Sequence, residues 1–328
     1  MKTIVLSDTH FGVKNNSTTW LKSQLDGLDE IINYIVSSGD NFDIVHCGDL
    51  FDSRSSINPY IVREVQSKLT ELATVVDKFI ILGGNHDYYS PMESDYNITS
   101  LDFLKLPKNV YIVTQEFCQF EDITVIPWFE FHNADRLLHI VKQLSDTSII
   151  YTHTDLGNIP ADLNTAIRDI DIPIISGHIH IPDMSNSKRL TIGNCYALNF
   201  LDANSTRGFY VLENNDVSTI QFHELKNPIR FYRIYNNKIF EFDTSVLRQI
   251  DKLEIYLDSQ FYTSEIYRNK IEELQKCCDT NIIINATQEL GELENIRNFD
   301  IEDIILDTVP EHLKKKFDIL KCHITSNN

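Results

Sequence analysis

The sequence predicts an α/β protein, because short apolar strand patterns alternate with longer amphipathic helix patterns along its first half. The strand patterns are runs of four or five residues rich in Ile, Val and Leu, which is typical of strands buried on both faces. The helix patterns repeat apolar residues every three or four positions. Regular alternation of the two favours a mostly parallel sheet whose strands are connected by helices.

The expected strands begin near the N-terminus and recur along the chain. A β-meander without helices is expected between Leu190 and Phe222. The earlier strands are expected at Thr3–Leu6, Asp43–Cys47, Phe79–Leu82, Val110–Val113, Ile123–Pro127, Ser148–Tyr151 and Ile172–Ile175.

Three helices are expected between these strands. The first covers Trp20–Ile35, where apolar residues recur at helical spacing. The second covers Ile61–Leu72, with Asn58 as its cap and Pro59 at the first helical position. The third is expected at Asn133–Leu144, with the asparagine as its cap.

After residue 225 the pattern changes, which predicts a second, smaller domain. A strand at Leu253–Leu257, a helix ending near Gln275 and a strand at Asn281–Asn285 form a β-α-β unit. The last segment has apolar residues at helical spacing, interrupted at Pro310. The expected boundaries are residues 1–225, 226–290 and 291–328.

Composition narrows the class of protein. The 328 residues, 42% of them hydrophobic, fit a soluble globular protein of about two domains. No apolar run approaches the roughly 20 residues that span a bilayer, and Asp8 and His10 come too early for a signal peptide. The six scattered cysteines suggest reduced thiols in a cytosolic protein. The net charge of −19 argues against a generally basic nucleic-acid surface, so DNA affinity would depend on local sites.

Five of the expected strands end in side chains that bind metal ions. Because sites in open α/β sheets form beyond the carboxyl ends of strands, we expect these side chains to converge on one edge. Within a pair such as Asp8 and His10, residues two apart in an extended segment face the same way. The candidate ligands are Asp8, His10, Asp49, Asn85, His153, His178 and His180.

Seven ligands are too many for one tetrahedral ion, and they suit two ions about 3.5–4 Å apart that share a carboxylate. Oxygen and imidazole ligands without thiolates favour Mn²⁺, with Fe²⁺ or Zn²⁺ as alternatives. Taken singly, an aspartate after a strand is most often a turn or helix cap, so the prediction rests on five strand ends together.

The other histidines do not lie at such strand ends, and we interpret them as structural. They are His46, His132, His139, His223, His312 and His323.

These residues lie in motifs that resemble the calcineurin-like metallophosphoesterases. The resemblance covers about the first 185 residues and rests on five motifs in order. Longer segments, "LSDTHFGVK", "GDLFDSR" and "RLTIGNCYALNFLDANSTRGFYVLE", look like the nuclease subunit of SbcCD-type DNA-repair complexes, and the short C-terminus looks most like the bacteriophage recombination-endonuclease branch. The five motifs are Asp8-x-His10, "GDLFD" from Gly48, "GNHD" from Gly84, His153 and "GHIH" from Gly177.

The resemblance implies a four-layer α-β-β-α metallophosphoesterase sandwich with a small C-terminal α/β cap domain and terminal helices. It also implies a dinuclear site in which Asp49 bridges the two ions. One ion would be held by Asp8, His10, Asp49 and His180, and the other by Asp49, Asn85, His153 and His178.

The implied activity is Mn²⁺-dependent hydrolysis of DNA, exonucleolytic on duplex ends and endonucleolytic on single strands, in recombination and repair. The implied partner is an SbcC-like SMC/ABC-type ATPase, and the subunit is expected to be a homodimer in the cytoplasm, or in the host cytoplasm if phage-encoded. The dimer contact is expected around Ser55–Leu72. The terminal helices are expected to grip the ATPase coiled coil, although they would otherwise pack on their own cap domain.

His86 is the expected catalyst beside the metals. Its side chain should diverge from that of Asn85, so it would point into the substrate cleft as a general acid or phosphate contact. Such an imidazole needs a carboxylate to orient it. Asp52 is the first candidate and Asp87 the second. Some relatives carry histidine at position 52, which leaves the endonuclease and exonuclease balance open.

Two other functions compete with a nuclease. One is another phosphoesterase of the superfamily, acting on nucleotides or phosphoproteins, although the chain has Ser53-Arg54 where the protein phosphatases have Arg-Gly. The other is a DNA-end-binding scaffold without catalysis, against which the complete ligand set argues.

Overall fold

The computed structural model describes residues 1–89, 98–121, 123–128, 134–144, 147–157 and 170–285. Two six-stranded sheets form the core. The first has the order β12-β11-β1-β2-β3-β4 and the second β5-β6-β7-β8-β10-β9. Strands β1 (Lys2–Leu6), β2 (Phe42–His46), β3 (Lys78–Leu82) and β4 (Val110–Val113) run parallel, while β11 (Gly208–Glu213) and β12 (Asp216–Glu224) form an antiparallel hairpin beside β1.

In the second sheet, four neighbouring strands are parallel and the two outer strands are antiparallel to them. Its strands are β5 (Cys118–Phe120), β6 (Ile123–Val125), β7 (Ile149–His153), β8 (Ile174–Gly177), β9 (Asp183–Asn186) and β10 (Arg189–Thr191).

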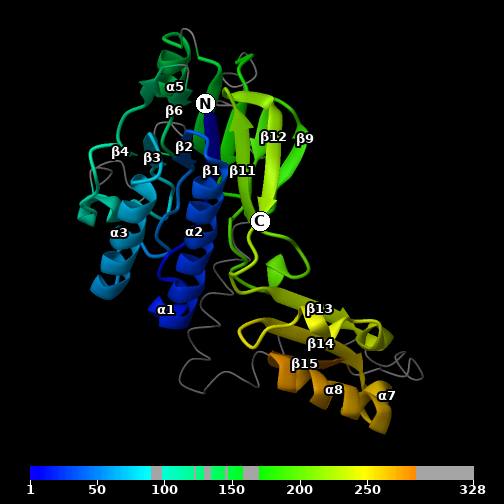
Figure 1. Cartoon of the computed structure of the whole chain (residues 1–328). Coiled ribbons are helices and arrows are strands. Elements are labelled where there is room, and N and C mark those ends of the chain that lie inside the picture. The colour runs from blue at the N-terminus through cyan, green and yellow to red at the C-terminus, as the bar shows by residue number, and fades with distance from the viewer. Residues whose placement is uncertain (90–97, 122, 129–133, 145–146, 158–169, 286–328) are drawn as a thin grey trace, which may run out of the picture.

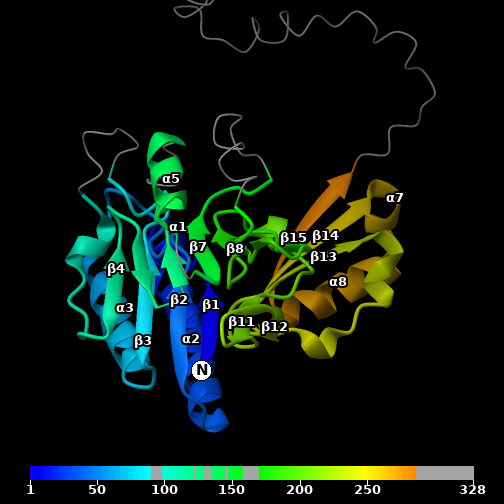
Figure 2. The ribbon, with the colours of Figure 1, turned by 90° about the horizontal axis from the view of Figure 1, so that it is seen from above.

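Helices α2 (Thr18–Ser38) and α3 (Pro59–Ala73) cover the outer face of the first sheet, and α5 (Ala134–Val141) lies on the far side of the molecule, as Figures 1 and 2 show. Side chains alternate accordingly along β1. Ile4 and Leu6 belong to the cluster under α2 and α3, whereas Val5 belongs to the cluster between the sheets. A third cluster joins α5 to the outer face of the second sheet. The expected four-layer α-β-β-α order is therefore confirmed.

The expected β-meander between Leu190 and Phe222 is wrong in its topology. Strand β10 joins the second sheet beside β8, and β11 and β12 join the first. A short 3₁₀ helix, η3 (Phe200–Asp202), lies between them. Alternation of apolar residues cannot show which of two stacked sheets a strand enters, which is why the sequence pattern looked continuous.

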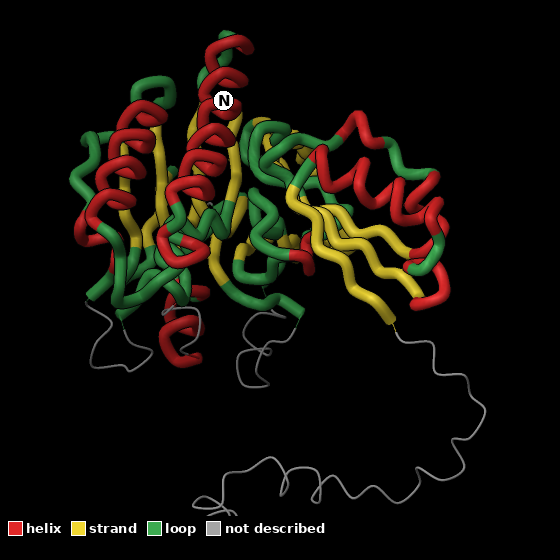
Figure 3. The backbone as a smooth tube through the Cα atoms, turned by 90° about the horizontal axis from the view of Figure 1, so that it is seen from below, coloured by secondary structure: helices red, strands yellow, loops and turns green. Residues whose placement is uncertain are grey.

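The C-terminal part forms a three-stranded parallel sheet of its own, set to one side of the core in Figure 3. Strands β13 (Phe231–Tyr235), β14 (Lys252–Asp258) and β15 (Asp279–Asn285) pair in this order, and α8 (Glu265–Cys277) connects the last two. This confirms the expected β-α-β unit. Short helices complete the described elements: α1 (Val13–Asn16), η2 (Ser100–Phe103), η4 (Asn236–Phe240), η5 (Thr244–Val246) and α7 (Ser259–Tyr262).

The cap packs on the core through a small apolar contact in which Trp20 and Ala197 meet Ile229 and Phe231. Two predictions lie outside the described residues: the terminal helical segment at 291–328, and Asn133 as the N-terminal residue that caps the third helix. The domain boundaries stay a prediction. Within the part of the chain that is described, no helix is both long and apolar enough to cross a membrane.

Candidate metal centre

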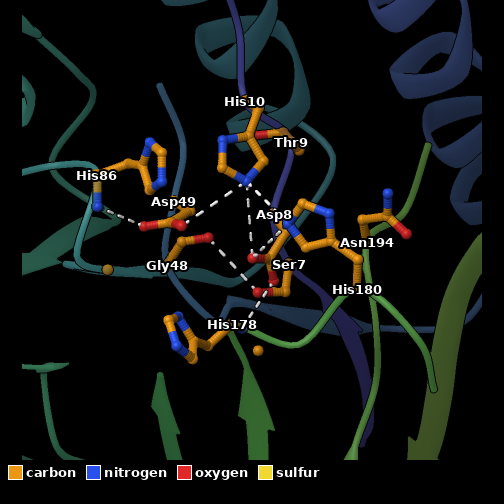
Figure 4. Close-up of polar contacts among 12 residues, drawn as sticks. Ser7, Asp8, Thr9, His10, Gly48, Asp49, His86, His178, His180 and Asn194 are labelled. Atoms are coloured by element: carbon orange, nitrogen blue, oxygen red, sulfur yellow. Dashed lines mark hydrogen bonds and ion pairs between the residues drawn. The ribbon is translucent and has the colours of Figure 1, made fainter. Parts of the chain in front are cut away.

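The seven predicted ligands meet at one edge of the core, where β1, β2, β3, β7 and β8 end. Figure 4 shows five of them, from β1, β2 and β8, converging from different loops. The edge carries a cavity of about 220 Å³ whose lining includes His10, Asp49 and His178. Parallel strands therefore bring together side chains that are up to 172 positions apart, from Asp8 to His180.

The loops that leave the strands are strained. Asp8, His10, Asp49 and His178 have left-handed φ angles of 53°, 44°, 55° and 79°. Non-glycine residues adopt this region at a cost of about 1–3 kcal/mol each, and they cluster at functional sites. The expected extended geometry for Asp8 and His10 is therefore wrong, although both side chains still reach the same point.

One group of ligands lies around Asp8. The Nε2 atoms of His10 and His180 are 3.2 Å apart, and they lie 3.8 and 3.6 Å from Oδ1 of Asp8. This oxygen is buried and has no hydrogen-bond partner in the described structure. Burying an unpaired carboxylate oxygen is costly, so its position facing two imidazole nitrogens fits a cation that all three would hold.

A second group lies around Asn85. Its Oδ1 is 3.1 Å from Nε2 of His153 and 2.7 Å from Nδ1 of His178. Oδ2 of Asp49 lies 3.3 Å from His153 Nε2 and 3.7 Å from His10 Nε2, so one carboxylate oxygen faces both groups. The structure thus brings the seven predicted ligands together in two groups, and their assignment to two ions stays a prediction.

The hydrogen bond of His153 also favours a cation at the site. Its Nδ1 lies 2.7 Å from the Cys47 carbonyl oxygen, so Nδ1 donates and a neutral ring leaves a bare lone pair on Nε2. That nitrogen faces only oxygen atoms, from Asp49 and Asn85. Lone pairs facing one another repel, so either a second proton or a cation must lie between them. Divalent metal binding meets this condition.

Carboxylates control protonation of the site when no ion is bound. Burial lowers the pKa of His10, but the carboxylates of Asp52 and Asp8 outweigh burial and raise it to about 10. Burial also lowers the pKa of His153, and the charges of Asp49 and Asp8 raise it to about 9. Burial tends to raise the pKa of Asp49, yet the charge of His153 and the other imidazoles lower it overall. Concentrated negative charge of this kind is what a divalent cation requires.

Residues 1–182 match the sequence model of the family described as calcineurin-like phosphoesterases. This chain belongs to that family. Three His/Asp groups within the phosphoesterase site have ligand atoms within 4.8 Å of one another: Asp8, His10 and His180; His10, Asp49 and His86; and Asp49, His153 and His178. Family membership and these groups make the protein a metal-dependent hydrolase.

A curated relative covers more of the phosphoesterase than the family model does. "Exonuclease subunit 1" of Enterobacteria phage T4 is 25% identical over 316 residues, which span 89% of this chain and 91% of the relative. Among solved structures, the 5′-nucleotidase of Candida albicans is 16% identical and has a TM-score of 0.33. That alignment covers 59% of this chain and 46% of the nucleotidase, and the likeness is too distant to bear on activity.

His86 lies beside the predicted metal ligands of this phosphoesterase. The group that orients its ring is not the one we expected. Its Nδ1 lies 2.7 Å from the backbone carbonyl oxygen of Asp52. The Asp52 carboxylate instead lies 3.5 Å from Nδ1 of His10, which lowers the pKa of Asp52. The expectation that the carboxylate of Asp52 or Asp87 orients His86 is therefore wrong, because the ring's hydrogen bond goes to a backbone carbonyl. A carbonyl cannot titrate, so it fixes the ring with Nδ1 as donor and leaves Nε2 for other partners.

Asp87, the second candidate, holds the loops together instead. Its carboxylate accepts hydrogen bonds from the backbone N–H groups of Gly84, Asp49, Leu50 and Phe51, at 2.9, 2.9, 3.4 and 3.2 Å. Burial raises its pKa to about 6. One side chain thus joins the loop after β3 to the loop after β2, and so fixes the two residues that would share the second ion.

Gly83 and Gly84, the first two residues of the segment "GGNHD", are required for space. A Cβ on Gly84 would lie 2.9 Å from Cγ of Asp49, closer than real Cβ contacts allow. Neither glycine of the motif has a positive φ, so lack of space for a Cβ, and not a left-handed backbone, explains them. Gly48 does have a φ of 94°, and a Cβ there would lie 2.5 Å from Nδ1 of His153. These contacts let the backbone approach the ligands closely.

Sequence reasoning missed the supporting residues under the strained loops. Gln24 on α2 donates from Nε2 to the Thr9 carbonyl oxygen at 2.5 Å. Ser7 donates from Oγ to the Cys47 carbonyl oxygen at 3.0 Å. A polar residue at an apolar helix position was the one available signal for Gln24. Nothing in the local sequence marks Ser7, because its role depends on a loop 40 positions away.

Proposed function

We propose that this protein is a DNA nuclease subunit that uses two divalent ions, with Mn²⁺ as the preferred metal. The observation that carries this proposal is Oδ2 of Asp49, which lies between two groups of ligands. A shared carboxylate is typical of two-ion sites that hydrolyse phosphate esters. The similarity to a phage protein named as an exonuclease subunit supports DNA as the substrate.

The ligands of one ion would be Asp8, His10, Asp49 and His180, and those of the other Asp49, Asn85, His153 and His178. The orphaned Asp8 oxygen and the Nε2 atom of His153, which faces oxygen atoms of Asp49 and Asn85, both fit this assignment. When bound, the ions would supply a nucleophile at neutral pH and neutralise phosphate charge. Every ligand is an oxygen or a nitrogen, which accommodates Mn²⁺, Fe²⁺ or Zn²⁺.

His86 would assist the departure of the 3′-oxygen. Because Nδ1 of His86 donates to the Asp52 carbonyl oxygen, a protonated ring carries its second proton on Nε2. His86 and Asp52 both line the metal cavity. A protonated imidazole in this position can donate to a leaving oxygen as a general acid. Asp52 would act on two histidines. Its carboxylate contacts the ring of His10, and its backbone carbonyl orients the ring of His86.

We further propose that the nuclease works in recombination and repair with an SbcC-like ABC-type ATPase, as a homodimer whose contact involves the region of α3. The core of residues 1–225 would carry the chemistry, the cap of 226–290 would cover it, and the tail of 291–328 would bind the ATPase. A net charge of −19 favours a partner that supplies part of the DNA grip.

A nuclease assay with Mn²⁺ on duplex and hairpin DNA, with and without the ATPase and ATP, tests the proposal. We expect wild-type protein to cut DNA and Asp49→Asn to lose activity by at least about 100-fold. Hydrolysis of a nucleoside monophosphate without any cleavage of DNA would instead identify a nucleotide phosphatase. DNA binding without hydrolysis of either substrate would identify a scaffold.

A further inference from the structure

We infer that Lys14, at the rim of the metal cavity, binds a backbone phosphate of the nucleic-acid substrate next to the one that is cleaved. The inference rests on the proposed nuclease function. Lys14 is the one lysine or arginine among the described residues that line this cavity. Its neighbours there include the carboxylates of Asp49 and Asp52, so a nucleic-acid strand needs a cation at the entrance.

The backbone around Lys14 is unusual. Gly12, Lys14, Asn15 and Asn16 have φ angles of 98°, 56°, 57° and 60°, so the short element α1 turns with left-handed geometry. The turn is closed by the N–H of Asn16, which donates to the Gly12 carbonyl oxygen at 2.8 Å. Glycine and asparagine tolerate this region, whereas lysine adopts it at a cost.

Lysine at position 14 adds backbone strain to the turn, so we expect its side chain to have a role. Position 14 could hold asparagine, like the two positions after it, with less strain. The lysine contributes no ion pair to stability, because no carboxylate lies within 4.0 Å of its Nζ in the described structure. Its ammonium group lies 5.7 Å from the ring centroid of Trp20. This contact supports the side chain without neutralising its charge.

The turn is tied to the metal loops, which sets the position of the charge. The N–H of Val13 donates to the His10 carbonyl oxygen at 3.1 Å, four residues before Lys14 along the chain. The Asn16 side chain accepts from the N–H of Asn58 at 3.4 Å. Lys14 is thus held at a fixed place outside the ligand groups. A phosphate on the ions and its neighbour on Lys14 would be held together.

The test replaces Lys14 by asparagine, which suits the left-handed turn, and by arginine, which keeps the charge. Lys108→Asn is the matched control, since this exposed lysine precedes β4 at the opposite end of the sheet. Each protein is assayed on a short single-stranded DNA over a range of salt, and on bis(p-nitrophenyl) phosphate, a diester with no second phosphate. The melting temperature is measured without metal.

We expect Lys14→Asn to raise KM for DNA by about tenfold and to reduce the slope of log(kcat/KM) against log[salt] by about 1 in magnitude. Lys14→Arg and Lys108→Asn should behave like wild type, and all four proteins should hydrolyse the small diester equally. The melting temperature of Lys14→Asn should equal or exceed that of wild type, because the turn is relieved.

Three results would overturn the inference. Unchanged KM and salt slope in Lys14→Asn would show that the lysine does not contact DNA. An equal loss on the small diester, or a lower melting temperature, would show that it supports the fold or the metal site. If wild type hydrolyses the small diester but never DNA, the proposed nuclease function fails as well.

Discussion

At the residue scale, the second partner of each histidine decides what the ring can do. His153 uses Nδ1 on a backbone carbonyl, and so does His86, but only His153 faces Asp49 and Asn85 with its other nitrogen. The residue types and their order predicted which side chains lie together at this edge. The group that orients His86 could not be predicted, because a backbone carbonyl carries no sequence signal.

The role of His86 separates catalysis from metal binding. We expect His86→Ala to keep its metal content while kcat on DNA falls by about 10² to 10⁴, because the general acid is lost. Metal content and nuclease rate should be measured on the same preparation. His139→Ala, at an exposed histidine on α5, is a control that should change neither value. Stoichiometric loss of one ion from His86→Ala would make His86 a ligand instead.

Metal affinity should rise with pH. His10 and His153 have pKa values of about 10 and about 9, so both rings are in the doubly protonated, charged form at pH 7 in the ion-free protein. Burial lowers the pKa of His178 and of His180, so these rings are already neutral. Metals bind neutral imidazole, so filling the site should release about two protons at pH 7. Affinity should weaken as pH falls from 8 to 6.

Titration calorimetry in buffers with different ionisation enthalpies measures this release. The number of protons per protein follows from the dependence of the observed enthalpy on the buffer. Proton release near zero, or an affinity that does not change between pH 6 and 8, would contradict the protonation states assigned to the two rings.

At the scale of secondary structure, the elements themselves were predictable and the loops were not. Continuous apolar runs predicted β1 to β4, and the Asn58-Pro59 pair predicted the start of α3, where Asn58 accepts from the N–H of Tyr60 at 2.8 Å. The left-handed turns after β1 and β2 depend on hydrogen bonds to distant groups. Asp87 illustrates this, since its four backbone partners come from two different loops.

Asp87→Ala should be strongly destabilising. Removing the carboxylate leaves four buried N–H donors unpaired, which we expect to lower the free energy of unfolding by at least about 3 kcal/mol. Asp102→Ala is the matched control, because the exposed Asp102 accepts from one N–H, that of Thr99, and its loss should cost about 1 kcal/mol. Urea unfolding without metal compares the two. Equal small losses would mean that the loops hold without Asp87.

At the scale of the whole molecule, the family resemblance implied two layers of strands between helices, but the sequence did not show how the chain divides its strands between the two sheets. The β10 and β11 strands follow one another and enter different sheets. In the segment between these strands, Leu198 and Asn199 line the metal cavity. The next residue, Phe200, contacts the cap, and its ring centroid lies 4.8 Å from that of Phe231. Core and cap therefore meet beside the site.

The central claim is that two ions share Asp49, and metal analysis of purified variants tests it most directly. Elemental analysis after reconstitution with Mn²⁺ should find two ions per chain in wild type. His180→Ala should retain one ion, because only the group around Asp8 loses a ligand, whereas Asp49→Asn should lose most of both. A single ion in wild type, or two ions retained by Asp49→Asn, would contradict the shared carboxylate.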